Sequence, residues 1–243
     1  PCTAIPIATT LAQSWDMDLI HRMGELVGEE MKQLHVDLWL APGMNIHRNP
    51  LCGRNFEYYS EDPVLTGLCA ATETKGVQSQ KGKGTTIKHF AGNNQEDNRM
   101  FTNAHISERA LREIYLKGFE IAVKTAQPYA IMTSYNLING VHSANNYDML
   151  QNIARDEWGF EGLVMTDWYT SQDTTEMGMV SPSGKYSHSS SVQCIKAGND
   201  LQMPGCQQNV DDIVEAVNEG KEITKADLQR CAKHILSVAL KTM

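Results

Sequence analysis

The sequence lacks the features that mark several large classes of protein. No block of like charge interrupts it, because 21 basic and 29 acidic side chains are interspersed along 243 residues, with a net charge of -8. A nucleic-acid-binding protein usually carries a basic patch or stripe, so we expect no nucleic-acid partner. No apolar run approaches the roughly 20 residues of a membrane-spanning helix, so we expect no membrane partner either.

Paired metal or disulfide ligands are missing as well. The six cysteines are scattered without a Cys-x-x-Cys pair, and the eight histidines are equally dispersed. A structural zinc site needs clustered ligands, and a disulfide framework is typical of small secreted domains. We therefore expect free thiols, no metal, no cofactor and a cytoplasmic location. Secretion stays open, because a processed leader can precede Pro1.

What is present is an alternation of short apolar runs with longer segments of helical period. Near-continuously apolar runs are typical of parallel strands that are buried on both faces. The candidate strands are 36–40, 85–90, 129–134, 162–167 and 197–203, with a sixth at 3–6. The candidate helices are 16–34, 107–125 and 224–240. The pattern predicts an α/β fold, either a closed (β/α) barrel or an open doubly wound sheet.

Polar clusters that follow successive candidate strands favour the barrel. They are Lys88–His89, Tyr135–Asn136 and Asp167–Trp168. Catalytic groups of TIM-type barrels collect at the carboxyl ends of the strands. A doubly wound nucleotide binder would instead show GxGxxG or GxxxxGK[ST], and neither occurs in the sequence. About six strand-helix units are visible where a full barrel has eight, so we expect residues 1–243 to form one catalytic (β/α)8 TIM-type barrel domain that is incomplete at its start.

Four polar motifs follow one another along the chain. They read RNPLCGRNFEYYSEDP at 48–63, KHFAGNNQEDNR at 88–99, MTSYN at 132–136 and VMTDW at 164–168. Together they resemble the successive signatures of glycoside hydrolase family 3, and specifically of its β-glucosidase branch. LAQSWD at 11–16 and AGNDLQMP at 197–204 extend the resemblance along essentially the whole chain.

The resemblance implies a retaining mechanism, in which one carboxylate attacks the anomeric carbon and a second carboxyl group protonates the leaving oxygen. By its match to the Thr-Asp-Trp motif, Asp167 is the nucleophile. An aspartate at the end of a barrel strand also lies where catalytic groups collect, although a helix N-cap or another structural role is commoner for such a residue. Attack requires the ionised form. We therefore expect Arg54 and Lys88 to lie close to Asp167 and to lower its pKa.

The resemblance also implies a set of residues that hydrogen-bond the sugar hydroxyls, for which charged donors are the stronger partners. These are Arg54, Lys88, His89 and Arg99. For His89 the alternative is a buried histidine bonded to backbone groups. For Arg99 it is a surface ion pair with the acidic pair Glu96–Asp97.

Further side chains are expected to shape or support the pocket. Tyr135 and Trp168 would form its walls, and Met132 is either pocket wall or ordinary core packing. The Ser/Gly-rich stretch 171–191 reads as a long loop that borders the pocket.

Three acidic residues are expected to act indirectly or not at all. Glu57 and Glu61 either hold Arg54 in place or are simply solvated. Asp200 closes a candidate strand and is expected to be structural.

Two parts of the family are expected to lie outside this chain. One is an Asp-Gly-Pro segment before Pro1, and the other is an α/β sandwich domain that carries the acid/base glutamate. No acid/base residue can be identified in the sequence. General acid help is worth about 10²- to 10⁴-fold, so we expect the isolated chain to be weakly active or inactive. The expected partners are the sandwich domain, in a longer or permuted chain, or a second copy of the chain.

The function that the resemblance implies is hydrolysis of terminal non-reducing β-D-glucosyl residues from a β-glucoside or oligosaccharide. A β-xylosidase or exo-glucanase of the same family, or a non-catalytic carbohydrate-binding barrel, are the alternatives. The intact Thr-Asp-Trp motif favours the enzyme over the binder. The N-acetylglucosaminidases of the family carry a catalytic histidine in a loop that this sequence does not show.

Overall fold

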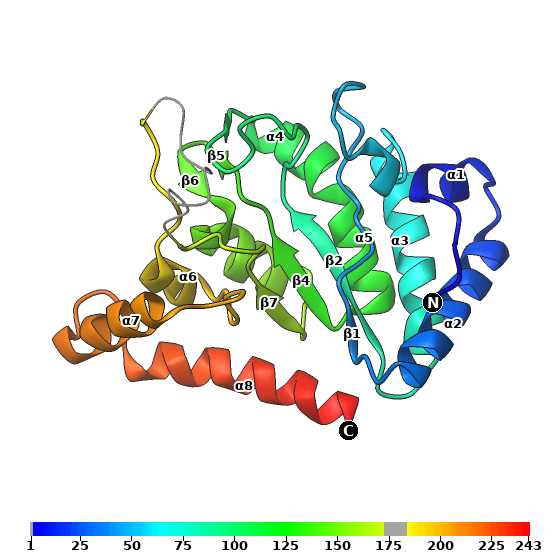
Figure 1. The fold of residues 1–243 in the computed structure, drawn as a ribbon. Coiled ribbons are helices and arrows are strands. Elements are labelled where there is room, and N and C mark those ends of the chain that lie inside the picture. The colour runs from blue at the N-terminus through cyan, green and yellow to red at the C-terminus, as the bar shows by residue number, and fades with distance from the viewer. Residues whose placement is uncertain (1, 173–183) are drawn as a thin grey trace.

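The computed structural model describes residues 2–172 and 184–243, and a four-stranded parallel sheet lies at its centre (Figure 1). The sheet has the order β1-β2-β4-β7, and every neighbouring pair is parallel. Its strands are β1 (Leu38–Trp39), β2 (Gly84–Phe90), β4 (Ala130–Thr133) and β7 (Leu163–Met165). A second, smaller sheet joins β3 (Asn103–Ala104), β5 (Leu137–Ile138) and β6 (Val141–His142).

Helices alternate with the strands of the main sheet. The N-terminal ones are α1 (Ala8–Gln13), α2 (Met17–Gln33), the short η1 (Asn55–Glu57) and α3 (Pro63–Gln78). The central ones are α4 (Glu108–Ala110), the π-helical η2 (Leu111–Tyr115), α5 (Lys117–Ala126), the short η3 (Ser143–Asn145) and the π-helical η4 (Asp148–Glu157). The C-terminal ones are α6 (Ser191–Ala197), α7 (Gln207–Glu219) and α8 (Lys225–Thr242). In Figure 1, α2, α3 and α5 lie on one side of the sheet, and α8 runs along its lower end.

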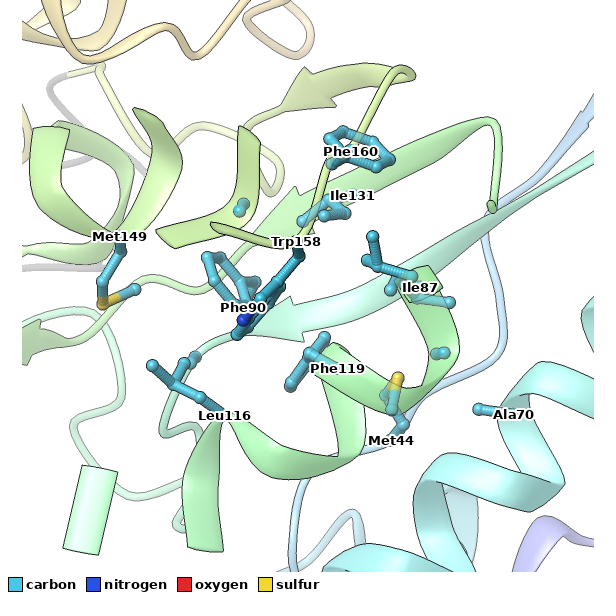
Figure 2. Close-up of a cluster of buried hydrophobic side chains, with 14 of the residues drawn as sticks. Met44, Ala70, Ile87, Phe90, Leu116, Phe119, Ile131, Met149, Trp158 and Phe160 are labelled. Carbon is cyan, nitrogen blue, oxygen red and sulfur yellow. The ribbon is translucent and has the colours of Figure 1, made fainter. Parts of the chain in front are cut away.

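Both faces of the sheet are packed, as the apolar strands require. Ile87, Ile131 and Val164 belong to one core cluster with side chains from α3, α5 and η4 (Figure 2). Within it the Phe90 ring makes edge contacts with Phe119 and Trp158, at centroid distances of 5.1 and 5.9 Å. The alternate positions Met132 and Met165 pack instead with Val238 of α8. Period-two alternation therefore divides the strands between two cores.

The predicted parallel α/β arrangement is confirmed, but two of the six candidate strands are wrong. Segment 197–203 begins as the end of α6, which Gly198 closes with a positive φ of 82°, and only Leu201 makes a bridge, to Met165. Segment 3–6 joins no strand ladder in the described residues. Thr3 is instead bonded to Glu30 of α2.

The three predicted helices are confirmed, one with an interruption. Asp16 caps α2 by accepting the Leu19 N–H at 2.9 Å, and Thr224 and Asp227 form the capping box of α8. Segment 107–125 is divided into α4, η2 and α5 by a π-helical turn. The pattern does not reveal α3, because buried residues lie nearly all round it.

The loop expected at 171–191 can be judged only in part, because 173–183 lie outside the described residues. Of the described end, Tyr186 packs against Met100, Phe101 and Tyr135. Asp200 is structural, as expected. It accepts hydrogen bonds at 2.8 Å from the Arg155 guanidinium and the Val164 backbone N–H, and its other oxygen lies 2.8 Å from His234 Nδ1.

The core contains a carboxyl group that forms no ion pair with any residue that the structure describes. Glu73 of α3 is 3% exposed and accepts a hydrogen bond from the Tyr59 hydroxyl. Burial raises the pKa of Glu73 from 4.5 to about 8. The folded protein therefore holds a proton on Glu73 over a pH range in which the unfolded chain has lost it.

The sign of the resulting pH dependence follows directly. Because the pKa is higher in the folded state, the free energy of unfolding should fall as the pH rises from 4.5 to about 8. The slope should reach about 1.4 kcal/mol per pH unit. We expect Glu73→Gln to remove this contribution, so that the variant gains stability relative to the wild type as the pH rises. Chemical denaturation at pH values across that range measures the effect, with the exposed Glu161→Gln as control. Parallel pH profiles of Glu73→Gln and wild type would contradict it.

Candidate active site

A pocket of about 400 Å³ opens at the carboxyl ends of β2, β4 and β7. Its lining includes all eight residues that the sequence singles out: Arg54, Lys88, His89, Arg99, Met132, Tyr135, Asp167 and Trp168. Leu40 and Tyr169 complete the lining, and the sequence gives no sign of either. The structure thus brings together residues from four separate motifs, while the role of each stays a prediction.

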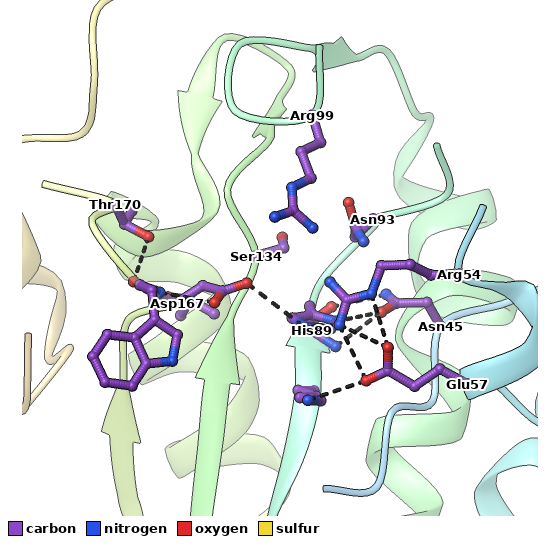
Figure 3. Close-up of polar contacts among 12 residues, drawn as sticks. Asn45, Arg54, Glu57, His89, Asn93, Arg99, Ser134, Asp167 and Thr170 are labelled. Carbon is purple, nitrogen blue, oxygen red and sulfur yellow. Dashed lines mark hydrogen bonds and ion pairs between the residues drawn. The ribbon is translucent and has the colours of Figure 1, made fainter. Parts of the chain in front are cut away.

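Asp167 follows β7 and is 6% exposed. Its Oδ1 accepts the backbone N–H of Trp168 at 2.8 Å. The backbone carbonyl of Asp167 accepts the Thr170 hydroxyl at 2.8 Å, which fixes the turn after the strand (Figure 3). The neighbouring main chain and the Tyr135 hydroxyl therefore both hold this carboxylate.

The expectation that nearby cations lower the pKa of Asp167 is wrong in its net direction. Burial raises the pKa above 3.8, and it outweighs the Trp168 N–H, Arg54, Arg99 and the Tyr135 hydroxyl, which all act to lower it. Lys88 is not among the groups that act on this pKa, and its Nζ lies 3.0 Å from Glu57 Oε1.

Glu57 holds two of the cations in place. It accepts from Arg54 Nε at 2.8 Å and Arg54 Nη2 at 3.1 Å, and it also pairs with Lys88. Burial acts to raise the pKa of Glu57, but Lys88 and Arg54 together outweigh it and lower the pKa below its usual value. Of the two glutamates considered in the sequence, Glu57 therefore supports Arg54, whereas Glu61 is exposed.

Arg99 forms the ion pair considered for it and also lines the pocket, while its contact with a sugar stays a prediction. Its Nη1 lies 2.7 Å from Glu96 Oε2, so the ion pair is present. Its guanidinium also lies 4.9 Å from the centroid of the Tyr135 ring, in cation-π geometry, and it lines the pocket. The ion pair therefore orients Arg99 and leaves it at the pocket.

His89 is a neutral imidazole. Burial, followed by Arg54, Lys88 and Arg99, lowers its pKa well below 6.5. Arg54 Nη2 lies 3.1 Å from His89 Nε2, and because a guanidinium group can only donate, Nε2 is the acceptor. The ring proton therefore lies on Nδ1, which is 3.2 Å from the Tyr58 hydroxyl. The 3.6 Å separation between His89 Nε2 and Asp167 Oδ2 is therefore a contact between two acceptors and no ion pair.

Lys88 and His89 both line the pocket although they are consecutive in β2. In a regular strand, successive side chains point to opposite faces. Here the register with β4 shifts, since Lys88 pairs with Met132 and Phe90 pairs with Thr133. His89 is the extra residue at this shift, which has the register of a β-bulge, and the Lys88–His89 peptide bond is cis.

Other expectations concern features away from the pocket. All six cysteines are free. Across residues 2–172 and 184–243, no group of three His, Cys, Asp or Glu side chains is placed to hold a metal ion. No helix in the described part of the chain is long and apolar enough to cross a bilayer.

Comparison with known proteins assigns the chain to a family. Residues 1–238 match the Glycosyl hydrolase family 3 N terminal domain. The chain belongs to glycoside hydrolase family 3. It is 48% identical, over 100% of its length, to an exo-alpha-(1->6)-L-arabinopyranosidase of Bifidobacterium breve, and 43% identical, over 98%, to a beta-glucosidase of Ruminococcus albus.

Solved family 3 structures share the fold. Beta-glucosidase 3B of Thermotoga neapolitana, solved in complex with glucose, is 47% identical and superposes over 98% of the chain with a TM-score of 0.88. The Bifidobacterium adolescentis β-glucosidase gives a TM-score of 0.86. The predicted barrel fold class is thereby confirmed as the family's N-terminal barrel domain. The chain spans 29% of the length of the B. breve relative, 24% of that of the R. albus relative and 32% of the T. neapolitana chain.

The balance of burial and charge at Asp167 can be tested by titration. We expect the carboxyl carbon of Asp167, followed by NMR and assigned with Asp167→Asn, to titrate with a pKa above 3.8. Arg99→Met should raise this pKa further, because it removes one of the cations that oppose burial. Arg109→Met, at a side chain that is 84% exposed, is the control and should leave it unchanged. A lower pKa in Arg99→Met would contradict the assignment.

Proposed function

We propose that this chain is the sugar-binding, nucleophile-bearing part of a retaining β-glycosidase that removes terminal non-reducing β-D-glucosyl residues. The observation that carries the proposal is a buried carboxylate, Asp167, at the floor of a pocket lined by Arg54, Lys88 and Arg99. A pyranose presents several hydroxyl groups around its ring, and cationic donors are strong partners for hydroxyl oxygens. The pocket volume of about 400 Å³ lies in the usual range for small-molecule sites.

The two oxygens of Asp167 differ in their contacts. Oδ1 accepts the Trp168 N–H, and we propose that Oδ2 is the oxygen that bonds to the anomeric carbon. Neutral His89 lies 3.6 Å from this oxygen and does not neutralise it. Attack from Oδ2 would form the glycosyl-enzyme ester while the leaving oxygen departs with a proton, and water would later hydrolyse the ester.

The proton for the leaving oxygen requires a second carboxyl group. In retaining enzymes the two carboxyl groups lie about 5–5.5 Å apart. Asp167 is the sole carboxylate among the described residues that line the pocket. We therefore propose that the acid/base group comes from outside this described lining, and we expect the remainder of a longer chain or a partner chain to supply it.

A second candidate substrate is an α-L-arabinopyranoside. Two arabinopyranosidases are 48% identical to the chain over its full length, against 43% for the R. albus β-glucosidase. The arabinopyranose ring differs from glucose at C4 and lacks the hydroxymethyl group. Comparing kcat/KM for aryl β-D-glucoside, α-L-arabinopyranoside and β-D-xyloside on the full-length polypeptide would rank the candidates.

Covalent trapping tests the proposed function. Incubation with 2,4-dinitrophenyl 2-deoxy-2-fluoro-β-D-glucoside should add one fluoroglucosyl group to Asp167, because the good leaving group makes the acid less important. Peptide mass spectrometry identifies the labelled residue, and Asp167→Asn is the control. If neither the chain nor the full-length polypeptide is labelled while both bind glucose, the non-catalytic carbohydrate-binding alternative replaces the enzyme. Label on another residue would refute Asp167 as the nucleophile.

A further inference from the structure

The β-bulge in β2 interrupts main-chain pairing at His89, which lines the pocket. On one side, Met44 N–H donates to the Lys88 carbonyl at 2.7 Å and Gly43 bridges Lys88, so the chain after β1 pairs with β2 up to this point. On the other side, the pairing with β4 passes from Lys88 to Phe90. His89 is thus left out of the β2–β4 ladder register, although it is only 2% exposed.

The Asn45 side chain takes the place of a strand at His89. Its Oδ1 accepts the His89 backbone N–H at 2.8 Å, and its Nδ2 donates to the His89 carbonyl at 2.8 Å (Figure 3). A primary amide offers one acceptor and a donor, the same groups that a neighbouring peptide unit supplies in a ladder. Asn45 is 2% exposed, so water has little access to these groups.

We propose that Asn45 is a positioning residue that fixes the bulge and thereby aims Lys88 and His89 into the pocket. This inference rests on the proposed function for its effect on sugar binding. Asn45 does not line the pocket itself and acts through the His89 peptide. Without it, the buried His89 N–H and carbonyl would lose their partners, which proteins rarely tolerate. The bulge would then relax, and the two side chains would lose their common direction.

The chain contains a matched control for this arrangement. Asn139 holds the Ile106 peptide in the same two-point manner, accepting its N–H at 3.0 Å and donating to its carbonyl at 2.8 Å. Ile106 is not among the residues that line the pocket. Asn45→Asp and Asn139→Asp therefore make the same chemical change. Each keeps the acceptor and turns the donor into a carboxylate oxygen that faces a carbonyl.

The test compares these two variants in the natural full-length polypeptide. We expect Asn45→Asp to weaken glucose binding and to raise KM for an aryl β-D-glucoside by at least about tenfold, with a smaller change in kcat, because binding groups are displaced. Asn139→Asp should lower the melting temperature but leave glucose affinity and KM within about twofold of wild type. If folded Asn45→Asp binds glucose as the wild type does, or if both variants lose affinity equally, the positioning role is refuted.

Hydrogen-deuterium exchange separates this inference from the proposed function. In the wild type, peptides that cover β2 should show slow exchange at the His89 amide, and Asn45→Ala should lose this protection whereas Asn139→Ala should keep it. Fast exchange at His89 in the wild type overturns the inference even if no variant folds. If the wild type neither binds glucose nor is trapped, the proposed function fails, and the exchange result still decides whether Asn45 fixes the bulge.

Discussion

Charge compensation is the constraint on which the pocket depends. Arg54, Lys88 and Arg99 are partly buried, and a buried cation without a partner costs several kcal/mol. Glu57 and Glu96 satisfy all three. Because these cations are engaged, Asp167 makes no ion pair with a lysine or arginine within the described part of the chain, and burial decides the direction of its pKa shift. The two glutamates therefore hold Arg54 and Arg99, the two cations that act to lower the pKa of Asp167.

Much of this fold follows from local sequence pattern, and the reasons for the exceptions are physical. Apolar runs predict the strands at 85–90 and 129–134 because both faces of those strands are buried. The apolar run at 197–203 predicts a strand that is not formed. Helix α6 ends at Ala197, Gly198 adopts a positive φ, and only Leu201 makes a bridge. The sequence pattern does not reveal helix α3, because most of its residues are buried and its exposed positions include the apolar Val64 and Leu68, so no polar stripe sets its period.

The sequence also predicts eight of the ten residues that line the pocket, but it does not predict the pairing of Lys88 with Glu57. Residues that follow parallel strands meet at one edge of a sheet, which places the clusters at 88–89, 135–136 and 167–168 in a common site. Arg54 and Arg99 are expected there only because of the family resemblance. Which cation pairs with which carboxylate depends on side-chain reach across that edge. The sequence predicts Lys88 close to Asp167, whereas in the structure its ammonium group pairs with Glu57. The β-bulge at His89 leaves no local trace either, because it arises from the relation of β2 to its neighbours.

The two hydrogen bonds between Asn139 and Ile106 affect the chemical stability of Asn139. Asn139 precedes Gly140, and an Asn-Gly step is prone to deamidation, in which the glycine nitrogen attacks the side-chain amide carbon. Here both polar atoms of that amide are bound to Ile106, and the Gly140 N–H donates to Asn103 Oδ1 at 2.8 Å. Attacker and target are therefore both restrained in the folded chain. The hydrogen bonds that shape the turn between β5 and β6 therefore also slow the deamidation of Asn139, a thermolabile residue type, while the chain is folded.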